Sequence, residues 1–456
     1  MEVEIRYSKS PYNEETIAII NEGKPYVSPD VLNGKGLGVL TTCVFIVGVI
    51  AGTGFLTLPK AIDNAGWIGF LLVLVCCFLS AYTGHVLGKC WTLAQERNPD
   101  LTQGSIRYPY PAIGELAYGT FGRYLVSLSL NFTQFGGTVV LVLLAAENIV
   151  KLLPDGSKFN CCLVALTVGC VMTPFTWLGT PKEFWGIAVI ATLATATTSI
   201  ILFVSVIIHS ADIDVSDVTH SDVTVTTFFT AYGTICFAYN GHSCFPTFQS
   251  DMKEPKKFGK ALFIGYLVVF AMYTPSSSVA YFIYGSRVEP NILNTLPMSA
   301  TTTIISLLMT AHILSTIVIG INPLSQEIEH VLKVPERFTW KRILTRTVVM
   351  GAVLFVALSV PHFSSVLALV GGSTITILSF ICPPLFYLKL CKATKSTSER
   401  YIPLHTRVLL YEIIFVGLVA GIATSYSAVS DLASNKFTVP CYVDAVRACP
   451  AGTGGG

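Results

Sequence analysis

Apolar runs long enough to cross a lipid bilayer recur along almost the whole chain, and they limit its fold more than any other feature. A helix needs about 20 mainly apolar residues to span the hydrocarbon core of a membrane. We delimit eleven predicted spans, at about 38–58, 67–88, 122–150, 162–179, 184–208, 225–248, 260–284, 300–322, 343–360, 364–388 and 407–430. The sequence therefore predicts an all-α membrane protein with eleven transmembrane helices.

The composition agrees with this prediction and excludes several classes of function. Apolar residues make up 52% of the chain and charged residues only 12%, whereas soluble domains carry about 25% charged residues. The net charge of +2 and the lack of a basic stripe between aromatic residues exclude a nucleic acid partner. We find no metalloprotease, serine hydrolase or phosphate-loop motif, and no pair of carboxylates inside a span. An enzyme is therefore not expected, and no cofactor or metal site is predicted.

Positive charge orients the predicted helices. With the N-terminus in the cytosol, 23 of the 29 Lys and Arg residues fall on the cytosolic side, as the positive-inside rule requires. The predicted organisation is a cytosolic N-terminal tail (1–37), a membrane domain (38–430) and a non-cytosolic C-terminal tail (431–456). The C-terminus is then lumenal or extracellular.

This orientation places four cysteines on the oxidising side of the membrane: Cys161, Cys162, Cys441 and Cys449. A disulfide among them is compatible with the predicted topology. The sequence leaves the pairing open.

Two spans are interrupted near their middle by residues that tolerate non-helical backbone. The first span contains Gly52-Thr53-Gly54, and the sixth contains Asn240-Gly241-His242. Backbone groups without a helical partner are costly in hydrocarbon, so such a break persists only where it is buried in protein or lines a cavity. Matched breaks in two halves of a chain indicate the binding site of a secondary transporter.

The positions of the breaks predict an inverted repeat. If spans one to five and six to ten form the two halves, each half begins with a broken helix. Because five is an odd number, the second half enters the membrane from the opposite side. We therefore predict a five-plus-five inverted repeat of the LeuT-like type, with broken helices 1 and 6 and one additional C-terminal helix.

Free backbone groups at the two breaks suit a zwitterion. Amide N–H groups at helix N-termini attract a carboxylate, and free carbonyls attract an ammonium group. The predicted carboxylate contacts are the backbone of Gly52 and Gly54 and the hydroxyl of Thr53, and the ammonium group is expected to meet carbonyls near Phe237 and Ala238. The full predicted substrate-binding set is Ala51, Gly52, Thr53, Gly54, Phe237, Ala238, Tyr239 and Asn240, in which Tyr239 and Asn240 supply selectivity.

Few titratable groups lie inside the spans, and such groups are candidates for ion coupling. We select His242 at the sixth-span break, His312 in the eighth span and Glu147 near the end of the third. Each has a structural alternative, since a buried histidine can be a hydrogen-bonded core residue and Glu147 can meet solvent or Lys151. Four further polar residues line a cavity or bond helix to helix: Asn131, Gln134, Ser315 and Thr316.

Three motifs resemble those of a known family. Residues 52–61 (GTGFLTLPKA) with 64–67 (NAGW) look like the first-helix signature of the amino acid/auxin permease family. The sixth-helix region of its vesicular inhibitory amino acid and plant vacuolar branches is similar to residues 239–246 and 251–255, and its tenth helix to residues 370–373 and 383–387. The resemblance covers about residues 36–430 and implies the eleven-helix inverted-repeat fold. It also implies transport of amino acids, typically by symport or antiport with protons.

Several properties stay open at this point. We expect a proton-coupled transporter of small neutral amino acids that works as a monomer in the lipid bilayer. The alternatives are a sodium-coupled amino acid transporter, a sensor that binds an amino acid without net flux, and a channel. The resemblance favours a vesicular, vacuolar or lysosomal membrane, and the plasma membrane is the alternative. Neither the particular amino acid nor the direction of its transport follows from the sequence.

Overall fold

The computed structural model describes residues 6–9, 16–19, 36–98, 101, 108–154, 159–178, 185–213, 218–335, 337–392, 399–434 and 439–444. Most of the two predicted tails lies outside these residues, and Cys449 is among the residues outside them.

The first half of the chain opens with a short hairpin and continues as helices. Strands β1 (Arg6–Lys9) and β2 (Thr16–Ile19) pair antiparallel, with Arg6 opposite Ile19. The helices that follow are α2 (Val39–Ile50), α3 (Gly54–Ala65), α4 (Ile68–Arg97), α5 (Pro109–Leu152), α6 (Cys161–Thr176) and α7 (Trp185–His209), with the 3-10 turn η2 (Ser210–Asp212) after α7.

The named elements of the second half are all helices or helical turns. It contains α8 (Val225–Ala238), α9 (Phe245–Ser250), α10 (Phe258–Tyr284), α11 (Ile292–Thr295), α12 (Ala300–Val331), α13 (Trp340–Ser359), α14 (Phe363–Val370), α15 (Cys382–Leu390) and α16 (Leu404–Ser434). The 3-10 turns η4 (Pro255–Lys257) and η5 (Gly285–Arg287) flank α10, and the π-helical turns η6 (Gly371–Ile375) and η7 (Ile377–Ile381) join α14 to α15.

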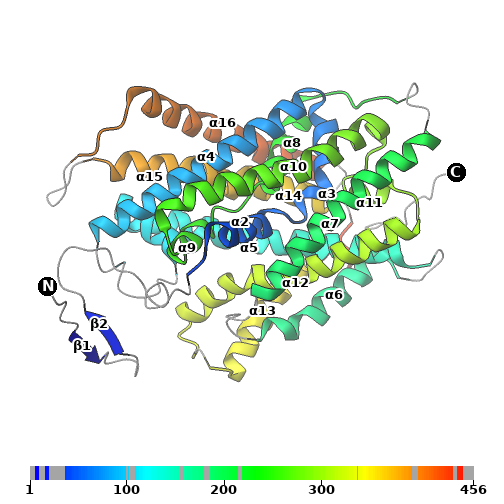
Figure 1. The fold of residues 1–456 in the computed structure, drawn as a ribbon. Helices are drawn as coiled ribbons and strands as arrows, with labels where there is room; N and C mark the ends of the chain where they lie inside the picture. The colour runs from blue at the N-terminus through cyan, green and yellow to red at the C-terminus, as the bar shows by residue number, and fades with distance from the viewer. Residues whose placement is uncertain are drawn as a thin grey trace.

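The helices form one bundle whose two ends can be told apart (Figure 1). Leu37 forms a parallel bridge with Met252, just after α9, and we call this the N-tail end. At the opposite end α11 packs against α3, and Lys151 at the end of α5 donates hydrogen bonds to the carbonyls of Leu293 and Leu296, which flank the end of α11. We call this the C-tail end, because α6, the helix that follows α5 in the sequence, is joined there to the C-terminal segment.

That junction is a disulfide between Cys162 and Cys441, which answers the question of pairing for these two residues. The Cys441 amide also donates to the carbonyl of Leu358 at the end of α13, over 2.8 Å. Cys161 takes part in a disulfide as well. The C-terminal segment is thus attached to the same end of the bundle as the start of α6.

The distribution of side chains is that of a membrane protein. Many large apolar side chains point outward from the helices, where a lipid bilayer would cover them, among them Phe132, Ile190, Phe355, Phe415 and Ile422. Polar side chains such as Thr42, Thr195, His242 and Ser306 are buried inside the bundle. This arrangement places the polar groups against protein partners and leaves the outer surface apolar.

The described residues contain eight helices that are long and apolar enough to cross a membrane, or nine if the bent pair of α2 and α3 is one span. Two shorter apolar helices, α6 and α8, coincide with the predicted fourth and sixth spans. The prediction of an all-helical membrane domain is confirmed, and the hairpin of β1 and β2 is a departure from it in the tail. The count of eleven spans and the inverted repeat stay predictions.

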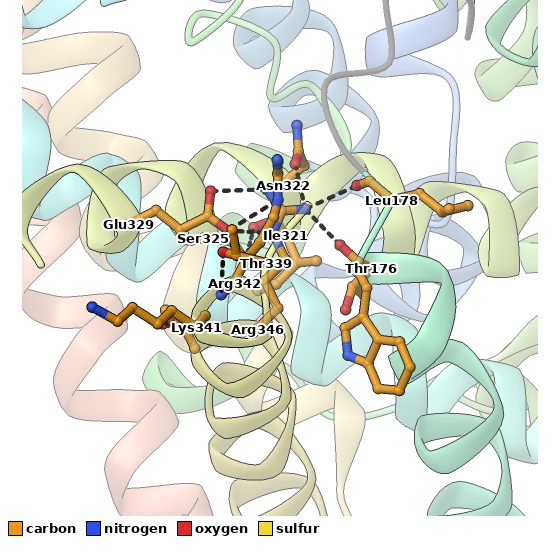
Figure 2. A network of polar contacts seen from close by, with 12 residues as sticks. Thr176, Leu178, Ile321, Asn322, Ser325, Glu329, Thr339, Lys341, Arg342 and Arg346 are labelled. Atoms are coloured by element: carbon orange, nitrogen blue, oxygen red, sulfur yellow. Dashed lines mark hydrogen bonds and ion pairs between the residues drawn. The ribbon is translucent and has the colours of Figure 1, made fainter. Parts of the chain in front are cut away.

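A buried ion pair joins three unbroken helices at the N-tail end (Figure 2). Arg346 of α13 binds the carboxylate of Glu329 of α12 through two nitrogens, at 2.5 Å and 3.2 Å. Its third nitrogen donates to the Thr176 carbonyl at the end of α6, at 2.5 Å. We call this group the Glu329–Arg346 clamp, because one guanidinium connects α12, α13 and α6.

Candidate functional site

The first break separates α2 from α3, which are bent by 60° relative to each other. The hydroxyl of Tyr273, on α10, donates to the Ile50 carbonyl at 2.8 Å and accepts from the Gly52 amide at 3.4 Å. A side chain 221 residues away in the sequence thus satisfies backbone groups that the break leaves open. At the start of α3, the amides of Phe55 and Leu56 donate to the carbonyls of Gly52 and Thr53, each at 3.2 Å.

The second break separates α8 from α9. The Tyr266 hydroxyl, also on α10, donates to the carbonyl of Tyr239 at 3.1 Å. The Tyr273 hydroxyl lies 3.5 Å from the carbonyl of Ala238 and therefore reaches both breaks. The two tyrosines are seven residues apart on α10, so they share one face of that helix.

The two breaks contact each other directly. A Cβ atom on Gly54 would lie 2.4 Å from the Cα of Ala238, and a Cβ on Gly241 would lie 2.9 Å from the Ile50 side chain. The lack of a side chain at Gly54 therefore lets α3 pack against the end of α8. Within the predicted substrate-binding set, Gly52, Phe237 and Asn240 are half-buried, and Ala51, Thr53, Gly54, Ala238 and Tyr239 are buried.

His312 lies beside the first break. Its Nδ1 is 3.2 Å from the Ala191 carbonyl and 3.2 Å from the Thr195 hydroxyl, both on α7. A carbonyl can only accept, so the hydrogen-bond pattern assigns the ring proton to Nδ1 and leaves Nε2 as a basic nitrogen. This Nε2 faces Gly52 and would lie 3.3 Å from a Cβ there.

In His242 the two ring nitrogens have the opposite roles, and the side chain lies deeper in the bundle than that of His312. Its Nε2 is 3.0 Å from the hydroxyl of Thr83 on α4, and that hydroxyl lies 2.9 Å from the Leu79 carbonyl, to which it donates. His242 is completely buried, and its Nδ1 has no hydrogen-bond partner among the described residues. Its basic nitrogen is therefore enclosed by protein, whereas that of His312 faces a half-buried glycine.

Glu147 is not grouped with the breaks. Its carboxylate accepts from the Asn294 amide at 3.3 Å, at the C-tail end beside α11. This contact joins α5 to α11.

The predicted cavity-lining residues divide into two groups. The hydroxyls of Ser315 and Thr316 donate to carbonyls of their own helix, at 2.9 Å and 2.8 Å. On α5, Asn131 and Gln134 are half-buried, and the side-chain oxygen of Gln134 is buried without a partner among the described residues. The neighbouring Thr133 bonds to Thr374 of η6 at 2.7 Å, which indicates that this part of α5 faces the tenth predicted span.

Four residues at the breaks were not among the predicted site residues: Tyr266, Tyr273, Thr83 and Thr195. A buried tyrosine hydroxyl usually requires a hydrogen-bond partner, so two tyrosines on one face of an apolar span were a usable signal. The two threonines offered none, because a threonine in an apolar helix commonly bonds to its own backbone.

An apolar cavity of about 320 Å³ lies between α5, α6 and α12, away from both breaks. Ile149, Val168 and Leu314 are among its lining residues. It offers no charged group to a zwitterion, so we do not assign the amino acid site to it.

Comparisons with known proteins identify the family. The family model described as "Transmembrane amino acid transporter protein" matches residues 35–430. Amino acid transporter AVT1D of Arabidopsis thaliana is 28% identical over 405 residues, which cover 85% of this chain and 68% of that protein.

Solved structures share the fold at low identity. The structure of MhsT in complex with L-phenylalanine aligns with a TM-score of 0.56 at 12% identity, over 89% of this chain and 100% of that one. A Na⁺-coupled sialic acid symporter aligns with a TM-score of 0.54 at 12% identity, over 90% and 92%. The family match extends from the start of the first broken span to the end of α16, and the resemblance inferred from the three motifs is confirmed. The chain belongs to the transmembrane amino acid transporter family.

Proposed function

We propose that this protein moves small neutral amino acids across a membrane by alternating access and that protons drive the movement. The substrate would bind where the two breaks meet. Because Gly54 is packed against Ala238, the substrate carboxylate is assigned to the Thr53 hydroxyl and to the amide of Gly52, beside His312. On binding, the Gly52 amide would exchange the Tyr273 hydroxyl for the carboxylate. The ammonium group is assigned to the carbonyls of Phe237 and Ala238, with Tyr239 and Asn240 as the selectivity groups.

The observation that carries the proton coupling is the direction of His312 Nε2. A basic nitrogen aimed at Gly52 can take up a proton next to the assigned carboxylate, and the protonated ring would attract that carboxylate. An unperturbed imidazole titrates near pH 6.5, in the range between the cytosol and an acidic compartment. His242 is the second candidate, and its enclosed position makes it the weaker one. Glu147 comes third, because its contact lies at the C-tail end.

The proposed topology has eleven crossings with the N-terminus in the cytosol and a transmembrane transporter domain over residues 38–430. The N-tail and C-tail ends lie on opposite sides of the bundle (Figure 1), as an odd number of crossings requires. The disulfide of Cys162 and Cys441 supports a lumenal or extracellular C-tail end, since disulfides persist in oxidising compartments. Together with the resemblance to vacuolar transporters, this favours the membrane of an acidic compartment. The binding site lies within one chain, so we propose a working monomer.

The test is uptake of labelled neutral amino acids into proteoliposomes, with and without a proton gradient at constant sodium. We expect accumulation that collapses with a protonophore. The variant His312→Gln should keep saturable binding and lose at least tenfold in gradient-driven accumulation, because an amide cannot carry the proton. His405→Gln, at an exposed position, is the matched control and should behave as the wild type.

Three outcomes would contradict parts of the proposal. Uptake by His312→Gln with unchanged proton dependence would remove His312 and direct the same test to His242. Uptake driven by a sodium gradient alone would establish the sodium-coupled alternative. Saturable binding without uptake by the wild type would identify a sensor.

A further inference from the structure

A connecting segment covers the C-tail end of the first broken span. Residues 218–223, which we call the strap, lead into α8 and lie against α3, α10 and the turn after α10. His220 stacks on Tyr281 of α10, with ring centres 4.4 Å apart, and Tyr281 in turn meets Trp67 edge-on at 5.9 Å. The strap is therefore packed against the end of α10.

Backbone contacts set the strap close to its neighbours. The Ser286 amide donates to the Thr219 carbonyl at 2.8 Å, and a Cβ on Gly285 would lie 2.2 Å from that same oxygen. Gly285 has φ +52, a left-handed conformation that glycine adopts readily. The turn after α10 is thus shaped to receive the strap.

One buried carboxylate fastens the strap to α3. Asp63 has no exposed surface. It accepts from the Ser221 hydroxyl at 2.6 Å, from the Ser221 amide at 3.2 Å and from the Lys60 ammonium at 3.0 Å. A buried carboxylate is tolerated only with such partners, so these groups form a unit that we call the latch, made of Lys60, Asp63 and Ser221.

The latch lies where access to the paired breaks from the C-tail end would have to open. α3 and α8 are the half-helices on that side of their breaks, and they contact each other at Gly54 and Ala238. The strap enters α8 directly, because Thr224 caps that helix. A bond from α3 to the strap therefore links the two half-helices at their C-tail ends.

We propose that Asp63 is a positioning residue of the transport cycle, which keeps the C-tail side closed through Ser221 and Lys60 and releases it when that side opens. This inference rests on the proposed function. It assigns to Asp63 neither contact with the substrate nor a role in proton transfer. Asp63 would instead set the relative populations of the conformations open to the C-tail side and to the N-tail side. It would thereby change the apparent affinity for the amino acid measured from each side of the membrane.

The first experiment measures half-saturating amino acid concentrations from each side, in right-side-out and inside-out vesicles. Asp63→Asn weakens the latch and should raise the population open to the C-tail side. Apparent affinity scales with the population of the competent state. The KM on the C-tail side should fall and the KM on the N-tail side should rise, each by about three- to tenfold. Asp222→Asn, on the exposed part of the strap, is the matched control and should change neither.

A purely structural role would lower the maximal rate from both sides without opposite changes in KM, and that result would overturn the proposal. If Asp63→Asn does not fold, the pair Asp63→Cys with Ser221→Cys provides the second test, because the two side chains are 2.6 Å apart at their oxygens. Oxidation should crosslink α3 to the strap and reduce transport at least tenfold, and a reductant should restore it. Wild type under the same oxidant and reductant controls for the native cysteines.

Transport that continues in fully crosslinked protein would also overturn the role of the latch. A wild type that shows no uptake would contradict the proposed function and would not test the latch. Normal wild-type uptake with unchanged KM values in Asp63→Asn would contradict the latch and leave the proposed function in place.

Discussion

Two buried carboxylates, Asp63 at the C-tail end and Glu329 at the N-tail end, hold the bundle in different ways. Asp63 binds a lysine of its own half-helix and a serine of a connecting segment. Glu329 binds the guanidinium of Arg346 through two parallel hydrogen bonds, and a second arginine, Arg342, lies 3.4 Å away. Asp63 thus joins the broken helix to the strap, whereas Glu329 joins unbroken helices to one another.

The number and direction of the bonds explain the difference. Besides Glu329, Arg346 donates to the carbonyls of Thr176 and Leu178 and to the side chain of Asn322, at 2.5 Å, 3.1 Å and 3.0 Å. Figure 2 shows this guanidinium reaching from α13 to α12 and to the end of α6. A planar group with five donors holds several partners in fixed directions, whereas the Lys60 ammonium and the Ser221 hydroxyl each hold Asp63 through one hydrogen bond. The clamp thus fixes three helices in one geometry, whereas the bonds of the latch are of the kind that the proposed transport cycle would break and remake.

The largest effect should follow from removing the clamp. Arg346→Ala leaves Glu329 buried without its main partner, and breaking a buried ion pair in this way costs about 3–5 kcal/mol. We expect most of the protein to be lost from the monodisperse peak in detergent, and a strongly lowered Tm in what remains. Lys341→Ala, exposed on the same helix, should behave as the wild type. A Tm for Arg346→Ala equal to that of Lys341→Ala would show that the clamp does not hold these helices.

A smaller effect should follow from Arg346→Lys, which keeps the positive charge but loses the planar guanidinium group that binds several acceptors at once. A lysine can face Glu329 but cannot also reach α6 in the same geometry, so the Tm should fall by less than in Arg346→Ala. The KM values from the two sides should both stay within about twofold of wild type, because the clamp does not separate the two conformations. Opposite KM changes in this variant would mean that the clamp also opens during transport, and the contrast with Asp63 would fail.

The smallest effect is expected at the backbone bridge of the N-tail end. The Leu37 amide donates to the Asp251 carbonyl at 2.8 Å, and the Leu37 carbonyl accepts from the Lys253 amide at 2.9 Å. Leu37→Pro removes one of these bonds, which is worth about 1 kcal/mol, and Leu37→Ala keeps both. In the proline variant we expect the KM on the N-tail side to fall about two- to fivefold. A change in the same direction as for Asp63→Asn would refute the view that the two ends hold opposite sides closed.

Much of this molecule follows from local sequence. The bilayer requires each helix to be long and apolar, so hydropathy locates the spans. Helix α10 lies where it was predicted, and α4 and α12 begin where they were predicted but extend nine residues further. The breaks are local as well, because clustered glycines at 52 and 54 and the Asn240-Gly241 pair weaken a helix wherever it lies. Both breaks and the family could therefore be predicted before any contact was known.

The partners of those breaks could not be predicted, because they arrive from distant helices. Tyr273 reaches Gly52 across 221 residues, and Asp63 reaches Ser221 across 158. Within an apolar span the sequence identifies a hydroxyl or an imidazole but not the direction in which it points. Helix packing sets that direction. The spans and their breaks follow from local sequence for two reasons. Backbone in hydrocarbon must form its hydrogen bonds within a helix, and glycine has a low helix propensity. The site, the clamp and the latch exist because packing brings polar groups together that would each be too costly to bury alone.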